Sequence, residues 1–376
     1  MLKILLDRKA NYAAWAKEQG FDAILICARM RGRDDDYLLP AAPGKEYSGV
    51  ASRADAILIC ASGEGFYFCK YPEWFEEECN PFLRDAYTVV NIGDDYGATI
   101  AAALEGKNVK TVGFSPDEMN ASLYMAIASI PGVALKAWEC EETMRARRHH
   151  DAADIALITK AQRIAEETWL ELIRDIRPGM TEKEVQNRLV AGMIARGASS
   201  YSCHIVSSGR HTGNVHWGSD DTVMQKGDLI MFDFGAVYGG FCSDMTRTVA
   251  LGSFTEEQKR IYNIVLEAQY ACIDKMAVGV PAKDIHNEAV RVFAKYGLDQ
   301  YFTHGLGHNV GTIIHEYPYA DPESEDILEP GDLITVEPGL YFEDRFGVRI
   351  EDMVWLGPDG KVDLTVCPKD ELMIIG

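Results

Sequence analysis

The segment LIMFDFGAVYGGFCSDMTRTV, residues 229–249, decides the fold of this chain. Two apolar runs flank a Tyr-Gly-Gly turn signal, a pattern typical of a β-hairpin, and each run carries one aspartate, Asp233 and Asp244. If Tyr238 and Gly239 form a two-residue loop, the aspartates lie directly opposite each other, with Cβ atoms about 4.5–5.5 Å apart. Two carboxylates at so short a distance inside an apolar hairpin require a shared proton or a cation. With the register shifted by one or two residues, at least one of them would lie at the surface instead.

Length and composition indicate a folded protein of two or three domains. Of its 376 residues, 47% are hydrophobic, which is enough for packed cores. Its 58 acidic residues outnumber 37 basic ones, so the formal net charge is −21. This excess argues against nucleic acid or an anionic membrane as the main partner. The sequence has no apolar run of about 18 residues and no long apolar segment at the N-terminus, so we expect a cytoplasmic protein.

The nine cysteines fit the same compartment. They are scattered singly, without CxxC spacing, and their number is odd. We expect reduced thiols, mostly in the core, and neither a disulfide scaffold nor a zinc finger.

The first part of the chain, residues 1–145, is predicted to be a small α/β domain. Short apolar runs indicate strands, and a helical pattern follows the last of them; the strands are expected within 21–28, 55–69 and 110–116, and the helix within 119–130. The charged segment 139–154 is the predicted boundary region. We expect its adjacent His149 and His150 to lie on a solvated charged face, because neighbouring histidines on a helix point in different directions.

The rest of the chain contains an internal repeat. Residues 177–197 align with 277–297 at an offset of 100, and 226–235 align with 330–339 at an offset of 104. A helical pattern precedes each copy of the first block, and Ser/Thr-x-x-Glu/Gln capping signals begin at Thr181 and Thr255. The repeat therefore predicts a duplicated fold with a second hairpin equivalent to the first.

That second hairpin, residues 333–356, also carries two acids. Glu337 takes the place of Asp233, and Glu351 lies 14 residues later, against 11 between the two aspartates. Four carboxylates on apolar strands would mostly protonate unless a cation held them ionised. An all-oxygen site favours hard or borderline divalent metals.

Histidines lie between the two hairpins. The segment THGLGHNVGTIIHEYP, residues 303–318, supplies His304, His308 and His315, and a histidine ligand would shift the choice towards transition metals. Its glycine spacing is GxGxxxG, which differs from the dinucleotide fingerprint GxGxxG. We expect these glycines to let the backbone pack close to a ligand.

With these motifs, residues 150–376 resemble the catalytic domain of the pita-bread metallopeptidases. This family includes Xaa-Pro aminopeptidases, prolidases and methionine aminopeptidases, and it is related to creatinase. The motifs FDFG, SDMTRT, HGLGH, VEPGLY and VRIED match its five metal ligands, in this order at Asp233, Asp244, His308, Glu337 and Glu351. The resemblance implies an α+β fold: duplicated helices related by a pseudo-twofold axis on a curved antiparallel sheet, preceded by a smaller creatinase-like α/β domain over residues 1–145.

The resemblance also implies two divalent metal ions, with Mn expected and Co, Fe or Zn as alternatives. In the family scheme Asp244 and Glu351 bridge both ions, Asp233 completes one, and His308 with Glu337 completes the other. A water bridging the ions would attack the peptide carbonyl. Glu337 is the expected proton shuttle as well as a ligand.

Substrate-side histidines follow from the same resemblance. His315 matches the family histidine that hydrogen-bonds the substrate or the oxyanion, and His304 belongs to the same motif. His216 falls where the family has a further histidine, although Trp217 and the upstream SGRHTGN depart from the family pattern. His211 is an alternative for that role.

Two more residues are expected to orient the ligands. Arg349 lies two residues before Glu351, and Thr246 lies two residues after Asp244. Residues two apart on a strand share a face, so both side chains should lie beside the carboxylates. For Thr246, simple packing is an alternative.

The leading hypothesis is a metal-dependent exopeptidase that cleaves Xaa-Pro bonds in dipeptides or short peptides, as a homodimer. An alternative is a metal-using hydrolase of a small non-peptide amide, of the creatinase or ectoine-hydrolase kind. A third hypothesis is a binding module that has lost activity, against which the complete set of five ligands argues.

Overall fold

The computed structural model describes residues 2–27, 56–69, 82–92, 95–116, 119–138 and 140–376. The chain forms two compact units, Met1–Arg147 and Arg148–Gly376. Within the described residues, no helix is both long and apolar enough to cross a membrane.

The described part of the first unit contains a mixed six-stranded sheet in the order β4-β3-β2-β1-β5-β6. Strands β1, β2 and β3 pair antiparallel, whereas β4, β5 and β6 pair parallel to their neighbours. The strands are β1 (Ala23–Ile26), β2 (Ala56–Cys60), β3 (Gly65–Cys69), β4 (Thr88–Asn91), β5 (Thr111–Phe114) and β6 (Ala134–Ala137). The helices are α1 (Leu2–Glu18), α4 (Leu83–Ala86), α5 (Tyr96–Leu104), α6 (Ala121–Ala128) and α7 (Cys140–Ala146). This confirms the strands and the helix predicted within the first 130 residues.

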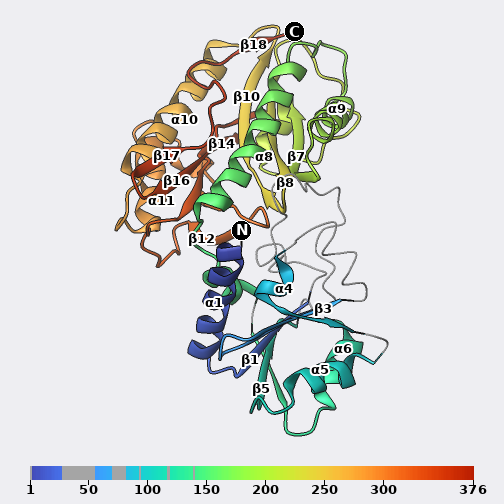
Figure 1. Ribbon diagram of the computed structural model, residues 1–376. Helices are drawn as coiled ribbons and strands as arrows, with labels where there is room; N and C mark the ends of the chain where they lie inside the picture. Colours follow the sequence, from blue (N-terminus) through green and yellow to red (C-terminus); the bar gives the residue numbers. More distant parts are fainter. Residues whose placement is uncertain (1, 28–55, 70–81, 93–94, 117–118, 139) are drawn as a thin grey trace. The chain divides into compact units, whose positions relative to one another are not determined.

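The second unit contains two pairs of long helices, drawn in green and orange in Figure 1. They are α8 (Ala152–Leu172), α9 (Glu182–Ala195), α10 (Glu256–Lys275) and α11 (Ala282–Ala294). Helices α8 and α9 pack on β8 (Leu229–Tyr238) and β7 (Ser200–Ser208), around a core that includes Trp169 and Phe232. Helices α10 and α11 pack around a second apolar core with the C-terminal strands.

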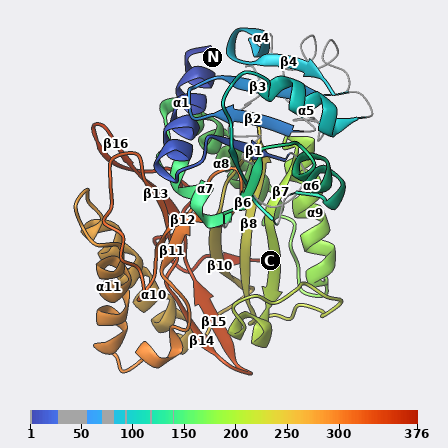
Figure 2. The ribbon, with the colours of Figure 1, turned by 90° about the horizontal axis from the view of Figure 1, so that it is seen from below.

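The strands of this unit form several small antiparallel groups. β7, β8 and β10 (Met245–Leu251) lie side by side, as Figure 2 shows, with β18 (Ile374–Ile375) parallel to β10 and β9 (Phe241–Cys242) paired to β8. The remaining strands are β11 (Gly307–Asn309), β12 (Glu316–Ala320), β13 (Leu333–Val336), β14 (Gly339–Phe342), β15 (Phe346–Arg349), β16 (Asp352–Gly357) and β17 (Gly360–Asp363). They pair as β11-β12, β13-β16-β17 and β14-β15.

The structure confirms the internal repeat. Helices α9 and α11 begin exactly where the offset of 100 places them, at Glu182 and Ala282. Isolated β-bridges precede both helices, Thr181 with Val223 and Pro281 with Ile327. The capping box predicted at Thr255 forms on α10, and Thr181 caps α9 by accepting a hydrogen bond from the backbone N of Glu184.

The predicted register of the first hairpin is wrong by one residue at the turn. The loop is Gly239–Gly240, since Tyr238 pairs with Phe241, and Asp233 therefore pairs with Thr246 instead of Asp244. Both loop glycines have positive φ, 58° and 86°. Tight hairpin turns of this kind favour positive φ at both central residues, which tyrosine adopts at a steric cost.

The boundary segment is also more buried than predicted. Arg148 is buried and makes a bidentate ion pair with Asp332, and His150 is buried with Nε2 2.9 Å from Asn309 Oδ1. Only His149 of the histidine pair is exposed. The prediction of a solvated face fails because the charges in this segment have partners about 160–180 residues away in sequence.

The prediction that the cysteines lie mostly in the core agrees with those whose burial the structure describes. Six cysteines are buried, namely Cys27, Cys60, Cys69, Cys242, Cys272 and Cys367. Cys203 is half-buried, and Cys79 lies outside the described residues.

Candidate functional site

The two aspartates of the first hairpin lie on one face of the sheet despite the corrected register. Asp233 is on β8 opposite Thr246, and Asp244 precedes β10, two residues from Thr246 and therefore on the same face. Both are buried, at 8% and 3% exposure. Opposite Asp244, a Cβ atom on Gly235 would lie 1.8 Å from the carbonyl oxygen of Ser243, so only glycine fits there.

Asp244, His308 and Glu351 form the centre of the site. Their potential ligand atoms all lie within 4.8 Å of one another, and all three residues are buried. Burial, reinforced by the charge of Asp233, raises the pKa of Asp244 well above its ordinary value. Burial and the charge of Asp244 do the same to the pKa of Glu351.

Two carboxylate oxygens at this centre lack protein partners. Asp244 Oδ1 and Glu351 Oε1 are buried without a hydrogen bond in the part of the chain that the structure describes. Buried acceptors of this kind are costly unless a proton or a cation satisfies them. Converging carboxylates with an imidazole are also a donor set that suits divalent transition metals. The residues therefore fit a divalent metal.

Glu337 and His308 form a close pair at one side of the centre. His308 Nε2 lies 3.3 Å from Glu337 Oε1, and Thr335 Oγ1 donates to the same oxygen. Burial alone would raise the pKa of Glu337, but the hydrogen bond and charge of His308 lower it to about 2. Burial alone would lower the pKa of His308, but Glu337 and Asp244 raise it to about 9. His308 Nδ1 lies 3.0 Å from the carbonyl oxygen of Asn309, which leaves Nε2 facing the carboxylates.

Arg349 and Thr246 hold the other two carboxylates. Arg349 Nη2 donates to Asp233 Oδ2 at 2.5 Å, and Thr246 Oγ1 donates to Glu351 Oε2 at 2.7 Å. Arg349 Nε also donates to Thr246 Oγ1, which joins the two interactions. Both residues thus contact carboxylates of the predicted ligand set, as their places on the strands indicated.

His315 and His304 lie next to the centre and are predominantly neutral near pH 7. The His315 ring is 4.3 Å from the His308 ring, and burial lowers the pKa of His315 to about 4. Burial also lowers the pKa of His304 to about 4. His304 Nδ1 lies 2.6 Å from the carbonyl oxygen of Gly305, and its Nε2 lies 2.9 Å from the Tyr341 hydroxyl. A neutral His304 satisfies both contacts, with Nδ1 as donor and Nε2 as acceptor.

His216 and His211 have different surroundings. His216 is exposed. It lies near His304 and His315, since its positive charge, when it is protonated, lowers the pKa of both. His211 is buried and bonded through Nδ1 to Glu182 Oε1 at 3.0 Å. His216 stays the predicted substrate-side histidine.

The glycines of residues 303–318 make close contacts with protein atoms. A Cβ on Gly307 would lie 1.8 Å from the Thr335 carbonyl oxygen, and one on Gly311 would lie 2.7 Å from Glu316 Oε1. We expected these glycines to let the backbone approach a ligand. In the structure they let protein segments pack closely against one another. Gly307 lets β11 lie against β13, which places His308 beside Glu337.

Comparison with known proteins decides the family. Residues 156–358 match metallopeptidase family M24, and this range contains all five predicted ligands. The chain belongs to metallopeptidase family M24. It is 33% identical over 290 residues to the uncharacterized peptidase YqhT of Bacillus subtilis, which covers 77% of this chain and 82% of that protein.

Solved structures of similar proteins agree with the M24 assignment. The chain matches an Xaa-Pro dipeptidase from Bacillus anthracis with a TM-score of 0.86 and 29% identity over 100% of both chains. It also matches an X-Pro aminopeptidase from Thermotoga maritima with a TM-score of 0.82 and 28% identity, over 96% of this chain and 99% of that chain. The predicted pita-bread α+β fold is thereby confirmed, and a divalent metal is the cofactor that M24 membership implies.

Sequence reasoning missed two side chains of this M24 site. Thr335 donates to Glu337 and accepts from the backbone N of His308, and Tyr341 bonds both His304 and Arg349. Thr335 lies two residues before Glu337, so the strand-face rule that identified Thr246 would have found it. Tyr341 belongs to the VEPGLY motif, but its two partners are set by the fold.

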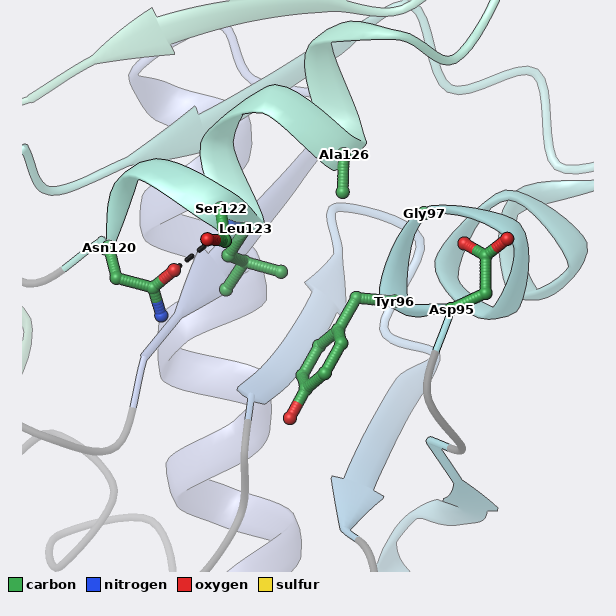
Figure 3. Close-up of a pocket in the computed structure, with 7 residues that line it drawn as sticks. All are labelled: Asp95, Tyr96, Gly97, Asn120, Ser122, Leu123 and Ala126. Carbon is green, nitrogen blue, oxygen red and sulfur yellow. Dashed lines mark hydrogen bonds between the residues drawn. The ribbon is translucent and has the colours of Figure 1, made fainter.

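Two other sites, a second cluster of titratable side chains and a cavity, differ from the M24 centre. Glu182, His211 and Asp220 also lie within 4.8 Å of one another, but Glu182 Oε1 already accepts bonds from Ser208 and His211. In the first unit, a cavity of about 590 Å³ lies between the starts of α5 and α6 (Figure 3). Its Asp95 and Asn120 cap these two helices. Neither place offers an arrangement comparable to the M24 centre.

Proposed function

We propose that this protein is a metal-dependent exopeptidase that hydrolyses the bond between an N-terminal residue and proline, in dipeptides or short peptides. The observation that carries the proposal is the convergence of Asp244, His308 and Glu351, with two buried carboxylate oxygens that have no hydrogen-bond partner among the described residues. The names of the similar solved structures, an Xaa-Pro dipeptidase and an X-Pro aminopeptidase, support the substrate class.

Five residues would hold two divalent ions, for which Mn is the first choice. Asp233, Asp244, His308, Glu337 and Glu351 would supply the carboxylate and imidazole groups that hold them. Bound there, the ions would lower the pKa of a water molecule and polarise the peptide carbonyl. His308 would bind through Nε2, since its Nδ1 faces the carbonyl oxygen of Asn309.

The chain's own side chains would position the ligands and move protons. Glu337 would take a proton from the attacking water and deliver it to the leaving nitrogen, since its carboxylate lies at the edge of the centre and is held there by a hydrogen bond from Thr335 Oγ1. His315, neutral near pH 7, would donate a hydrogen bond to the carbonyl oxygen as negative charge develops on it. His216 and His304 would contact the substrate from the same side.

The test is hydrolysis by chelator-treated protein, with and without added Mn²⁺, on Xaa-Pro dipeptides and on longer peptides that begin Xaa-Pro. Release of proline from dipeptides only in the presence of metal is the expected result. Cleavage of the longer peptides alone would assign aminopeptidase activity. Absence of cleavage across the panel by protein shown to bind metal would contradict the proposal and favour a small non-peptide amide as substrate.

Two assignments outside the centre belong to the same proposal. We infer that the first unit is a creatinase-like domain and that the active form is a homodimer. Similar solved structures that cover the whole length of this chain support the first assignment. Sedimentation equilibrium of the full chain tests the second.

A further inference from the structure

His150 is a buried histidine that the proposed chemistry does not use. Its side chain is 1% exposed and lies in the segment that leads into α8. Its Nε2 lies 2.9 Å from Asn309 Oδ1, and its Nδ1 lies 3.5 Å from Asp154 Oδ2. Burial of an imidazole costs free energy unless polar groups face its nitrogens, and these two contacts supply them. His150 is therefore joined to the residue that directly follows the predicted ligand His308.

The side-chain amide of Asn309 uses both of its donor and both of its acceptor positions. Its Nδ2 donates to the carbonyl oxygens of Arg148 at 3.2 Å and of Tyr317 at 2.9 Å. Carbonyl oxygens can only accept, so this atom is the amide nitrogen, and Oδ1 accepts the proton of His150 Nε2. Oδ1 also accepts from the backbone N of Val310 at 2.9 Å. Asn309 is fully buried, and an amide with these partners has a single favourable orientation.

His150 is itself held in place by its surroundings. Its backbone N donates to the carbonyl oxygen of Gly331 at 2.9 Å, and Arg148, two residues before it, makes the bidentate ion pair with Asp332. Burial alone would lower the pKa of His150, but the Asp154 carboxylate raises it above the ordinary histidine value. A charged imidazole is a stronger hydrogen-bond donor than a neutral one. The contact between His150 and the Asn309 amide is therefore both fixed and strong.

Asn309 contacts His308 through its main chain. The Asn309 carbonyl oxygen lies 3.0 Å from His308 Nδ1, which leaves Nε2 of His308 facing the carboxylates of the centre. The pairing of β11 with β12 is interrupted by a register shift between these two residues. At such a shift the ladder hydrogen bonds hold the backbone less completely than in a regular strand pair. The side-chain contacts of Asn309 therefore contribute to the position of its carbonyl oxygen.

We infer that His150 is a positioning residue for the metal ligand His308. Through the amide of Asn309 it fixes the carbonyl oxygen that orients the His308 imidazole, and thereby the direction of Nε2. The inference rests on the metal centre of the proposed function. Removing a group that orients a histidine ligand weakens metal binding by about 10- to 100-fold. His150 acts one contact further away, so a loss of about tenfold is expected.

The test measures the affinity of the chelator-treated full chain for Mn²⁺, by competition with a fluorescent chelator. His150→Leu should weaken binding by about tenfold. His150→Gln should bind as wild type does, because the amide nitrogen of glutamine takes the place of Nε2 and donates to Asn309 Oδ1. His149→Leu is the matched control and should also bind as wild type does, since His149 is the exposed neighbour and pairs with Glu329 instead.

His150→Asn separates positioning from stability, and it replaces the leucine variant if that variant does not fold. Asparagine is too short to reach Asn309, so this variant should show the same loss of affinity as His150→Leu. Both His150→Asn and His150→Gln remove the charge that pairs with Asp154, so thermal unfolding without metal should change similarly in the two. Metal affinity should therefore distinguish two variants of comparable stability.

A double-mutant cycle tests whether His150 acts through Asn309. Asn309→Ala alone should weaken Mn²⁺ binding at least as much as His150→Leu does, since it removes the amide that His150 holds. If the two residues act in series, adding His150→Leu to Asn309→Ala should cause no further loss. Independent effects would instead multiply.

The outcomes separate the inference from the proposed function. Wild-type affinity in His150→Leu and His150→Asn, an equal loss in His150→Gln, or losses that multiply in the cycle would each overturn the inference and leave the proposed function intact. Wild-type protein that binds no Mn²⁺ would overturn both. Wild-type protein that binds Mn²⁺ and cleaves no Xaa-Pro peptide would contradict the proposed function alone, because the affinities would still decide the role of His150.

Discussion

Glu351 illustrates how the candidate centre is built at the scale of single residues. Thr246 donates to one of its carboxylate oxygens, and the other is buried with no partner in the ranges that the structure describes. Its backbone is fixed on both sides, since its N donates to the carbonyl oxygen of Thr246 and its carbonyl accepts from Arg247 Nη1. Arg247 is held in turn by an ion pair with Asp352 at 2.8 Å. The position of Glu351 Oε1 is therefore fixed.

Thr246→Val should weaken metal binding by about 10- to 100-fold, because the variant removes the hydrogen bond that orients Glu351. The affinity is measured by competition between the protein and a fluorescent Mn²⁺ chelator. Thr168→Val is the matched control, since Thr168 is also buried but its hydroxyl donates to the Ile164 carbonyl within α8. Equal affinities in wild type and Thr246→Val would contradict this account of Glu351.

At the scale of elements, the two hairpins and β11 bring the ligands together through close backbone contacts. Gly235 faces Asp244 across the first hairpin, and Gly307 lies against Thr335 on β13. A side chain at either glycine would clash with a backbone oxygen at 1.8 Å. Glycine at these positions therefore determines where Asp244 and His308 lie.

Gly307→Ala should reduce both stability and metal affinity. Its Cβ would force β11 away from β13, and overpacking of this kind costs about 1–3 kcal/mol, a fall in Tm of several degrees. Calorimetry with and without Mn²⁺ measures both effects. Gly218→Ala is the control, because a Cβ there meets open space. A Gly307→Ala variant with the Tm and metal response of wild type would show that the contact is not needed.

Strand periodicity and the internal repeat were sufficient to predict the long helices and the hairpins of the second unit. The turn residue was mispredicted because Tyr-Gly and Gly-Gly both resemble turn signals, and only the φ values of Gly239 and Gly240 separate them. Contacts such as Tyr341 with His304 and Arg349, or His211 with Glu182, depend on distances between distant segments. No local pattern encodes those distances, so these contacts could not be predicted from the sequence.

At the scale of the whole molecule, the candidate centre is a concentrated negative charge within a chain of net charge −21. Burial raises the pKa of Asp244 and of Glu351 well above the ordinary values. A group whose folded pKa is raised holds protons that the unfolded chain has released. Stability is then lost as the pH rises through the folded pKa.

Metal-free protein should accordingly become less stable as the pH rises from about 6.5 to about 9, the window set by the pKa of His308 in the unfolded and in the folded chain. His308, with its pKa raised to about 9 by Glu337 and Asp244 against burial, acts in the same direction. The midpoint of urea unfolding of chelator-treated protein, measured against pH, gives the slope of stability with pH. The double variant Asp244→Asn with Glu351→Gln should have a flatter slope. A midpoint that rises with pH in wild type would contradict the assignment.

The most direct test of the central claim, that these side chains form a divalent metal centre, is calorimetric titration of chelator-treated protein with Mn²⁺. The account predicts two bound ions per chain for wild type and loss of this binding in Asp244→Asn, which removes the charge of a bridging ligand at constant size. Wild-type protein that binds no Mn²⁺, or an Asp244→Asn variant that binds two ions as tightly as wild type, would contradict it.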